Sequence, residues 1–187
     1  MRKKVIFGFV VFVLLFGDLI DELFDTSTYL AVGFFVTGVL LLFADSLSAG
    51  KRTEKDMGLF DAAVIGLMQC LGVPPGVSRS GATITGALMR GLTRESAAKF
   101  SFLMSIPAIL GAAVMEIKKI TTGEVSAESF DLLVMGFGFA VASLSGYLAI
   151  KFMLRLIKAR RLRYFSYYVF VLGTFILIDQ LFLNKFF

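Results

Sequence analysis

Residues 71–85 read LGVPPGVSRSGATIT and interrupt an otherwise apolar part of the chain. The two prolines cannot continue a helix, and the glycine after them allows the chain to reverse, so this stretch predicts a break between two helices. Polar residues follow the break at once: Ser78, Arg79, Ser80 and Thr83. An arginine between two serines, with apolar segments on both sides, requires a structural or functional explanation.

The composition around this stretch is typical of a membrane protein. Of the 187 residues, 57% are hydrophobic, and the mean hydropathy of +0.83 is well above that of an ordinary soluble domain. Charged residues are few and occur in groups spaced by about 20 residues, which is the length that a helix needs to cross a bilayer. We therefore predict an all-α, polytopic integral membrane protein, because a transmembrane barrel would show short alternating strands instead.

The positive charge of the chain does not indicate a nucleic-acid partner. The net charge is +5, but the basic residues fall in short loops between apolar segments, as the positive-inside rule expects. With a single cysteine, Cys70, and no histidine, an internal disulfide and a Cys/His metal site are both excluded. Any metal would be a hard, oxygen-bound cation such as Mg²⁺ or Ca²⁺.

The apolar segments fall into two length classes within a single predicted membrane domain, residues 1–187. Two segments, residues 57–71 and 80–89, are too short to cross a bilayer as helices and indicate re-entrant or internal helices. The others are interpreted as crossing helices: residues 5–16, 28–47, 97–117, 130–150 and 164–182. Residues 5–16 are short for a span by themselves, but neighbouring residues extend them.

The charges of the connecting loops indicate whether residues 57–90 cross the membrane or return to the same side. If they return, then the basic N-terminus, the loop at Lys51 and the most basic segment, residues 151–163, all face one side. The acidic residues near positions 18–22 and 124–128 then face the other side. A single crossing would place the most basic segment outside, so the positive-inside rule favours a re-entrant hairpin.

The polar groups at the tip of this hairpin can all donate hydrogen bonds to an anion. Non-helical backbone at membrane depth must be buried in protein or line a wet cavity, and an arginine there marks a functional site. The guanidinium of Arg79 matches phosphate oxygens with two parallel bonds, and the helix that begins near Ser80 adds N–H groups and a positive partial charge. The stretch therefore predicts a site for a phosphate-type anion.

Structural explanations of the same residues stay open. Ser78 or Ser80 could be a helix N-cap alone, with Arg79 paired to a carboxylate of another helix. Gln69, in the helix before the break, could either reach the site or cap a neighbouring backbone group. Two soluble-enzyme sites are excluded, because no Ser-His-Asp triad is possible without histidine and no Lys-Ser/Thr ending of a Walker A loop follows.

The segment from Asp61 to Pro107 resembles a known family. Its motifs IGLMQC, PPGVSRSGATITG and GLTRESAAKFSFLMSIP resemble the C-terminal half of the undecaprenyl-diphosphate phosphatases, the bacitracin-resistance family. The resemblance implies an integral membrane hydrolase that removes the terminal phosphate of a C55 polyprenyl diphosphate, which recycles the lipid carrier of cell-wall synthesis. It also implies one half of an inverted-repeat fold, as a multi-pass protein of the bacterial inner (plasma) membrane.

The resemblance assigns roles to residues of the polar stretch. Ser78, Arg79 and Ser80 are implied to be catalytic, with Arg79 binding the diphosphate. The implied partners are the polyprenyl diphosphate and the membrane, and a homodimer is a further hypothesis. Substrate contacts are expected from four more residues: Gly76, Gly81, Thr83 and Gln69.

This sequence departs from the family pattern in one respect. The family's pair of glutamates and its Pro-Ser-Ser-Thr-Gly-His segment have no counterpart here, and the chain contains no histidine. The divalent cation implied by the family would therefore be held by residues absent from this chain, and none of its own residues is assigned to a metal. We expect the chain to represent the C-terminal two-thirds of the family fold, with half of the site, and to be inactive alone.

Two other classes of function compete with the hydrolase. A lipid or anion transporter (flippase) module is the first, since transporters also bind anions at the N-termini of broken helices. A packing subunit without chemistry is the second. Release of phosphate from the lipid diphosphate would distinguish the hydrolase from both.

Overall fold

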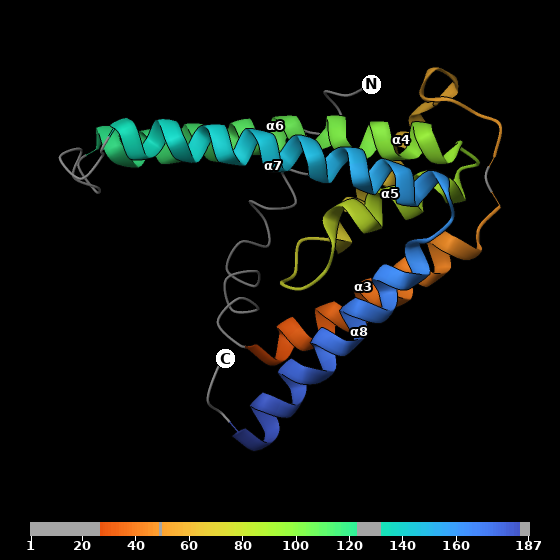
Figure 1. Cartoon of the computed structure of the whole chain (residues 1–187). Helices are drawn as coiled ribbons and strands as arrows, with labels where there is room; N and C mark the ends of the chain where they lie inside the picture. The colour runs from red at the N-terminus through yellow and green to blue at the C-terminus, as the bar shows by residue number, and fades with distance from the viewer. Residues whose placement is uncertain (1–26, 49, 123–131, 184–187) are drawn as a thin grey trace.

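The computed structural model of the chain is built from helices (Figure 1). It describes residues 27–48, 50–122 and 132–183, and this part of the chain contains no β-strand, which confirms the predicted all-α class. The predicted span at residues 5–16 lies outside the described residues. The elements are α3 (Ser27–Ser46), a 3-10 turn (Glu54–Asp56), α4 (Leu59–Leu71), α5 (Arg79–Met89), α6 (Arg94–Thr121), α7 (Leu132–Lys158), α8 (Leu162–Ile178) and a π-helical turn (Asp179–Leu183).

Within the described residues, four helices are long and apolar enough to cross a membrane: α3, α6, α7 and α8. They correspond to four of the predicted spans, and the chain is a multi-pass membrane protein. Large apolar side chains such as Ile109 on α6 and Phe137 on α7 are exposed. Such exposure is expected where a helix faces lipid, because lipid tails are as apolar as the side chains themselves.

The helix α7 is longer than the sequence pattern predicts. The pattern places a basic loop over residues 151–163, but the helix continues to Lys158. Lysine and arginine are good helix formers, and the Nζ atom of Lys158 lies 2.9 Å from a carboxylate oxygen of Glu95 on α6. The prediction of a loop at residues 151–158 is therefore wrong, because helix propensity and this ion pair both favour continuing the helix. The chain turns instead just after Lys158, where Arg160 has a φ of 52°.

The short helices α4 and α5 form an antiparallel hairpin, which confirms the helix break predicted at the two prolines. Near the tip, a Cβ on Gly72 would lie 2.6 Å from the Cα of Arg79, and at the base Asp61 pairs with Arg90. The connection contains Gly76, whose φ of +79° is readily adopted only by glycine. The re-entrant path of this hairpin in the bilayer remains a prediction from the loop charges.

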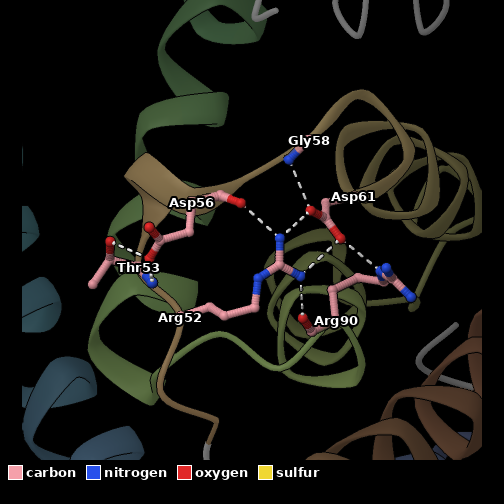
Figure 2. Close-up of polar contacts among 6 residues, drawn as sticks. All are labelled: Arg52, Thr53, Asp56, Gly58, Asp61 and Arg90. Carbon is pink, nitrogen blue, oxygen red and sulfur yellow. Dashed lines mark hydrogen bonds and ion pairs between the residues drawn. The ribbon is translucent and has the colours of Figure 1, made fainter.

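A buried carboxylate holds the base of the hairpin together, as Figure 2 shows. Asp61 accepts hydrogen bonds from Nη1 and Nη2 of Arg52 at 3.2 and 2.6 Å, and from Nε of Arg90 at 2.7 Å. It also accepts one from the backbone N–H of Gly58 at 2.8 Å, which satisfies a donor at the beginning of α4. The same carboxylate therefore joins the loop before α4, the start of α4 and the end of α5.

The other charged segments meet at the same end of the molecule. Asp45, near the end of α3, accepts hydrogen bonds from the backbone N–H of Leu162 at 3.3 Å and from Nε of Arg163 at 3.0 Å. At the start of α6, Arg94 donates to carbonyl groups in the last turn of α3 and to that of Leu47 just after it, the closest at 2.9 Å. The basic segments among the described residues share one side, as predicted, while the basic N-terminus lies outside the described residues and the side of the membrane remains a prediction.

The hairpin of α4 and α5 lies between two pairs of helices. The helices α3 and α8 lie side by side, α6 and α7 form a second pair, and the hairpin lies between them (Figure 1). An apolar cluster near the basic end packs the helices together, and it includes Leu41, Ile65, Leu88, Leu92 and Ile157. The tip lies away from this cluster, against the middle of α3.

Candidate functional site

The hairpin tip borders a cavity of about 490 Å³. Its walls come from the end of α4, the connection after it, the first turn of α5 and the middle of α6. Apolar side chains such as Val73, Phe102 and Ile109 form much of the lining. The polar lining residues are Gln69, Arg79, Ser80, Thr83, Ser101 and Ser105.

The first turn of α5 directs donors toward this cavity. Ser78 is the N-cap, and its Oγ accepts a hydrogen bond of 3.1 Å from the N–H of Gly81. Arg79 and Ser80 are the first two residues of the helix, where N–H groups lack partners within the helix and the macrodipole is positive. Ser78 is therefore an N-cap, as one structural explanation predicts; the anion site and the pairing of Arg79 with a carboxylate both stay predictions.

The structure separates the predicted catalytic and substrate-binding residues into two groups. Gly76, Thr83 and Gln69 line the large cavity together with Arg79. Ser78 and Gly81 instead border a smaller neighbouring cavity of about 70 Å³, which Ser80 also lines. Ser78 and Gly81 bond each other, so their role in contacting a ligand remains a prediction.

Thr83 and Ser101 form a buried hydroxyl pair at the cavity wall. Their Oγ atoms lie 2.6 Å apart, and the Thr83 hydroxyl is also 3.1 Å from the carbonyl oxygens of Arg79 and Ser80. A hydroxyl carries one proton, so if Thr83 donates to these carbonyl groups, Ser101 donates to Thr83. The hydroxyl of Thr83 is thus already engaged, and its contact with a substrate remains a prediction.

Gln69 lies in the last turn of α4 with its side chain buried. Its Oε1 is enclosed, and no hydrogen-bond partner for it occurs in the part of the chain that the structure describes. The Oε1 atom therefore caps no backbone N–H among the described residues, and the choice between a site contact and a cap stays a prediction. Leaving a buried amide oxygen unpaired costs about 1–3 kcal/mol, so a water or ligand in the adjoining cavity is the natural partner.

Three residues at the site were not identified from the sequence. Ser101 and Ser105 lie one helical turn apart on α6 and both line the cavity. Their i, i+4 spacing in FSFLMS places them on one face and was the available signal. Thr37 on α3, which bonds the tip, gives no local signal because its partners are about 40 residues away.

The cavity does not fit a divalent cation by itself. Its lining contains no carboxylate, and no group of three or more His, Cys, Asp or Glu residues that could hold a metal occurs among the described residues. Mg²⁺ and Ca²⁺ are bound chiefly by carboxylate and other oxygen ligands. The residues described here can bind an anion, but no chemical step of this chain is assigned to a cation.

The sequence matches the family "Bacitracin resistance protein BacA" over residues 3–175. The chain belongs to this family. The match includes the hairpin, the cavity and most of the four candidate spans, and it confirms the resemblance inferred from the motifs between Asp61 and Pro107.

Curated relatives of this BacA-family chain share one name. The chain is 45% identical over 165 residues to the undecaprenyl-diphosphatase of Carboxydothermus hydrogenoformans, covering 88% of this chain and 63% of that protein. It is 44% identical over 168 residues to that of Alkaliphilus metalliredigens, covering 90% and 60%. The chain therefore spans less than two-thirds of the length of these relatives.

The alignment with this chain covers almost the whole length of a third relative. The undecaprenyl-diphosphatase of Methanothermobacter thermautotrophicus is 47% identical over 174 residues, which are 89% of this chain and 92% of that protein. A protein that extends little beyond the aligned region thus carries the same name as the longer relatives. This relative provides a reference for the question of whether a short chain of this family is active.

Proposed function

We propose that this chain carries the diphosphate-binding part of an undecaprenyl-diphosphate phosphatase. The enzyme hydrolyses a C55 polyprenyl diphosphate to the monophosphate and inorganic phosphate, for recycling of the lipid carrier in cell-wall synthesis. The observation that supports this most directly is the position of Arg79 and Ser80 at the N-terminus of α5, on the wall of a cavity with apolar surroundings. The expected location is the plasma membrane, and a homodimer remains part of the proposal.

The role of these residues is electrostatic. Water adds to the terminal phosphorus while the bond from that phosphorus to the bridging oxygen breaks, and the lipid monophosphate leaves with that oxygen. Negative charge on the phosphoryl oxygens is stabilised by donors that are already oriented in the protein. Arg79 and Ser80 provide such donors, and the exposed apolar sides of α6 and α7 offer a path for the polyprenyl tail.

The finer part of the proposal is that the site is incomplete in this chain. The cavity lining lacks a carboxylate and the sequence lacks histidine, so a general base and cation ligands are expected from another polypeptide segment. On this proposal the chain alone binds diphosphate weakly and does not hydrolyse it. The Methanothermobacter relative extends little beyond the aligned region and is named undecaprenyl-diphosphatase. Its name favours the opposite outcome, in which a short chain hydrolyses the diphosphate alone, so an experiment must decide between the two.

The decisive experiment measures phosphate release from C55 diphosphate by the purified chain in lipid vesicles. The chain is assayed alone and together with the N-terminal part of a longer relative. Release only in the mixture supports the incomplete site, and release by the chain alone supports the phosphatase but overturns the incomplete site. Lipid translocation without phosphate release in either preparation overturns the phosphatase in favour of the transporter.

Variants of Arg79 identify its contribution. Arg79→Ala is expected to abolish release, and Arg79→Lys to recover only a small part, because lysine keeps the charge but not the planar pair of donors. Arg155→Ala is the matched control, since Arg155 lies near the end of α7 and lines neither of the two cavities. Full activity of Arg79→Ala would show that the proposed role is wrong.

A further inference from the structure

The surface of α3 that faces the hairpin tip is shaped to hold it. Gly33 and Thr37 lie one helical turn apart, on the same face of α3. A Cβ at Gly33 would overlap the carbonyl oxygen of Pro75, and a Cβ at Gly76 would overlap the carbonyl oxygen of Leu30. The two backbones therefore approach so closely that only glycine fits on either side of the contact.

Thr37 adds two hydrogen bonds to this backbone contact. Its hydroxyl donates to the carbonyl oxygen of Gly76 at 2.8 Å and accepts from the N–H of Ser78 at 2.7 Å. The residue is only 3% exposed. The Thr37 hydroxyl therefore donates at one end and accepts at the other end of the segment from Gly76 to Ser78, which leads into α5.

Thr83, Thr85 and Thr174 each bond a carbonyl group of their own helix, whereas the described hydrogen bonds of Thr37 include none within α3. A threonine in a helix commonly bonds the carbonyl group one turn earlier in its own helix. Thr174 on α8 does so, with its hydroxyl 2.8 Å from the carbonyl oxygen of Phe170, and Thr85 bonds Gly81 in the same way at 2.7 Å. Both hydrogen bonds recorded for Thr37 instead reach residues 39 and 41 positions away.

We propose that Thr37 is a positioning residue that sets the orientation of the anion-binding turn, acting through Ser78 and Gly76. The proposal rests on the proposed function, because it concerns the same site. Ser78 is the N-cap of α5 and directly precedes Arg79, so the direction in which Ser78 is held determines where the first turn of α5 points its donors. The span α3 is thereby a support of the site, although it contributes no residue to the cavity lining.

The test compares a variant that loses the Thr37 hydroxyl at nearly the same shape with a variant that keeps it. Thr37→Val keeps the shape but removes both hydrogen bonds, and Thr37→Ser keeps the hydroxyl. The matched control is Ser166→Ala on α8, which removes an equally buried hydrogen bond to α3, that of Ser166 to the carbonyl oxygen of Gly38 at 2.7 Å. This control bond joins α3 to α8 and not to the hairpin tip, so it reports general destabilisation only.

Two readouts are measured on the full chain in lipid nanodiscs. The first is hydrogen exchange of the Ser78 amide, which Thr37→Val should accelerate about tenfold, corresponding to loss of roughly 1.4 kcal/mol of local protection. The second is binding of farnesyl diphosphate, a short prenyl diphosphate, which Thr37→Val should weaken by about tenfold. Thr37→Ser should restore both values to near those of the unaltered chain, and Ser166→Ala should change neither.

Each outcome bears on one proposal. Unchanged exchange at Ser78 in Thr37→Val, or equal effects of Thr37→Val and Ser166→Ala, would overturn the positioning role. If the unaltered chain, with the N-terminal part of a longer relative added, neither binds nor hydrolyses the diphosphate, the proposed function fails. In that case the exchange measurement still decides whether Thr37 orients the turn.

Discussion

Asp61 and Arg90 lie 29 positions apart, and the Nε of Arg90 donates to the Oδ1 of Asp61 at 2.7 Å. This bond closes the base of the hairpin, at the opposite end from the contact of Thr37 with the tip. The hairpin is therefore fixed at both ends, by a charged group at the base and by a hydroxyl and two glycines at the tip.

Asp61→Asn should destabilise the chain. The carboxylate is 3% exposed and accepts hydrogen bonds from two arginines and one backbone N–H. Removing one member of a buried ion pair costs about 3–5 kcal/mol, but partial exposure of Arg52 and Arg90 reduces this to roughly 2 kcal/mol. The free energy of unfolding in detergent measures the change.

The control for this substitution is Glu116→Gln. Glu116 pairs with Lys119 at 3.2 Å, with both side chains more than half exposed, and such pairs contribute about 0–1 kcal/mol. A loss for Asp61→Asn no larger than that of the control would contradict the stabilising role of Asp61 at the hairpin base.

The contribution of Asp61 should depend on pH. Hydrogen bonding from Arg52 holds the pKa of the Asp61 carboxyl below its usual value, although burial opposes this. Because the pKa is lower in the folded chain than in the unfolded chain, the stabilisation is fully present above the unfolded value of about 4 and decreases as pH falls toward the folded value. The difference in melting temperature between the unaltered chain and Asp61→Asn should be constant above about pH 5 and shrink below about pH 4. A difference that grows on acidification would contradict this assignment.

Gly76→Ala should be much more damaging than Gly91→Ala. Both glycines have a left-handed backbone, with φ of +79° and +75°, so alanine costs about 1–2 kcal/mol of strain at either position. At Gly91 a Cβ would meet only Cδ of Arg52 at 3.9 Å, whereas at Gly76 it would overlap the backbone of α3. Thermal unfolding should show a loss at Gly76 that exceeds the loss at Gly91 by at least about 2 kcal/mol. Equal losses would mean that α3 does not contact the tip as described.

Gln69→Leu should raise the free energy of unfolding but weaken the binding of a diphosphate. Leucine removes the unpaired buried Oε1 without a large change in volume, so the free energy of unfolding should rise by about 1 kcal/mol. Binding of farnesyl diphosphate should weaken, because the cavity loses one of its polar groups. If Gln69 instead served as a structural cap, the same substitution would lower stability, and unfolding measurements with and without the diphosphate distinguish the two cases.

Much of the fold could be predicted because its signals are local. Hydropathy over about 20 residues indicates a membrane-crossing helix, and the pair Pro74–Pro75 with Gly76 breaks a helix wherever it occurs. The residues Ser78, Arg79 and Ser80 are adjacent in the chain, so one helix N-terminus necessarily brings their donors together. The end of α7 was placed wrongly because charge alone does not end a helix when the charged residues are good helix formers and Lys158 finds a partner on another helix.

Local sequence signals were therefore sufficient to predict the membrane class, the helix break and the group of donors that follows it. The distant side chains that support these features became apparent only in the folded chain: Thr37 beneath the tip, Ser101 against Thr83, and Arg52 with Arg90 around Asp61. The physical reason is that a helix or turn depends on residues within a few positions of one another. A buried hydroxyl, amide or carboxylate depends instead on whichever group packing brings within about 3 Å, and no local pattern identifies that group.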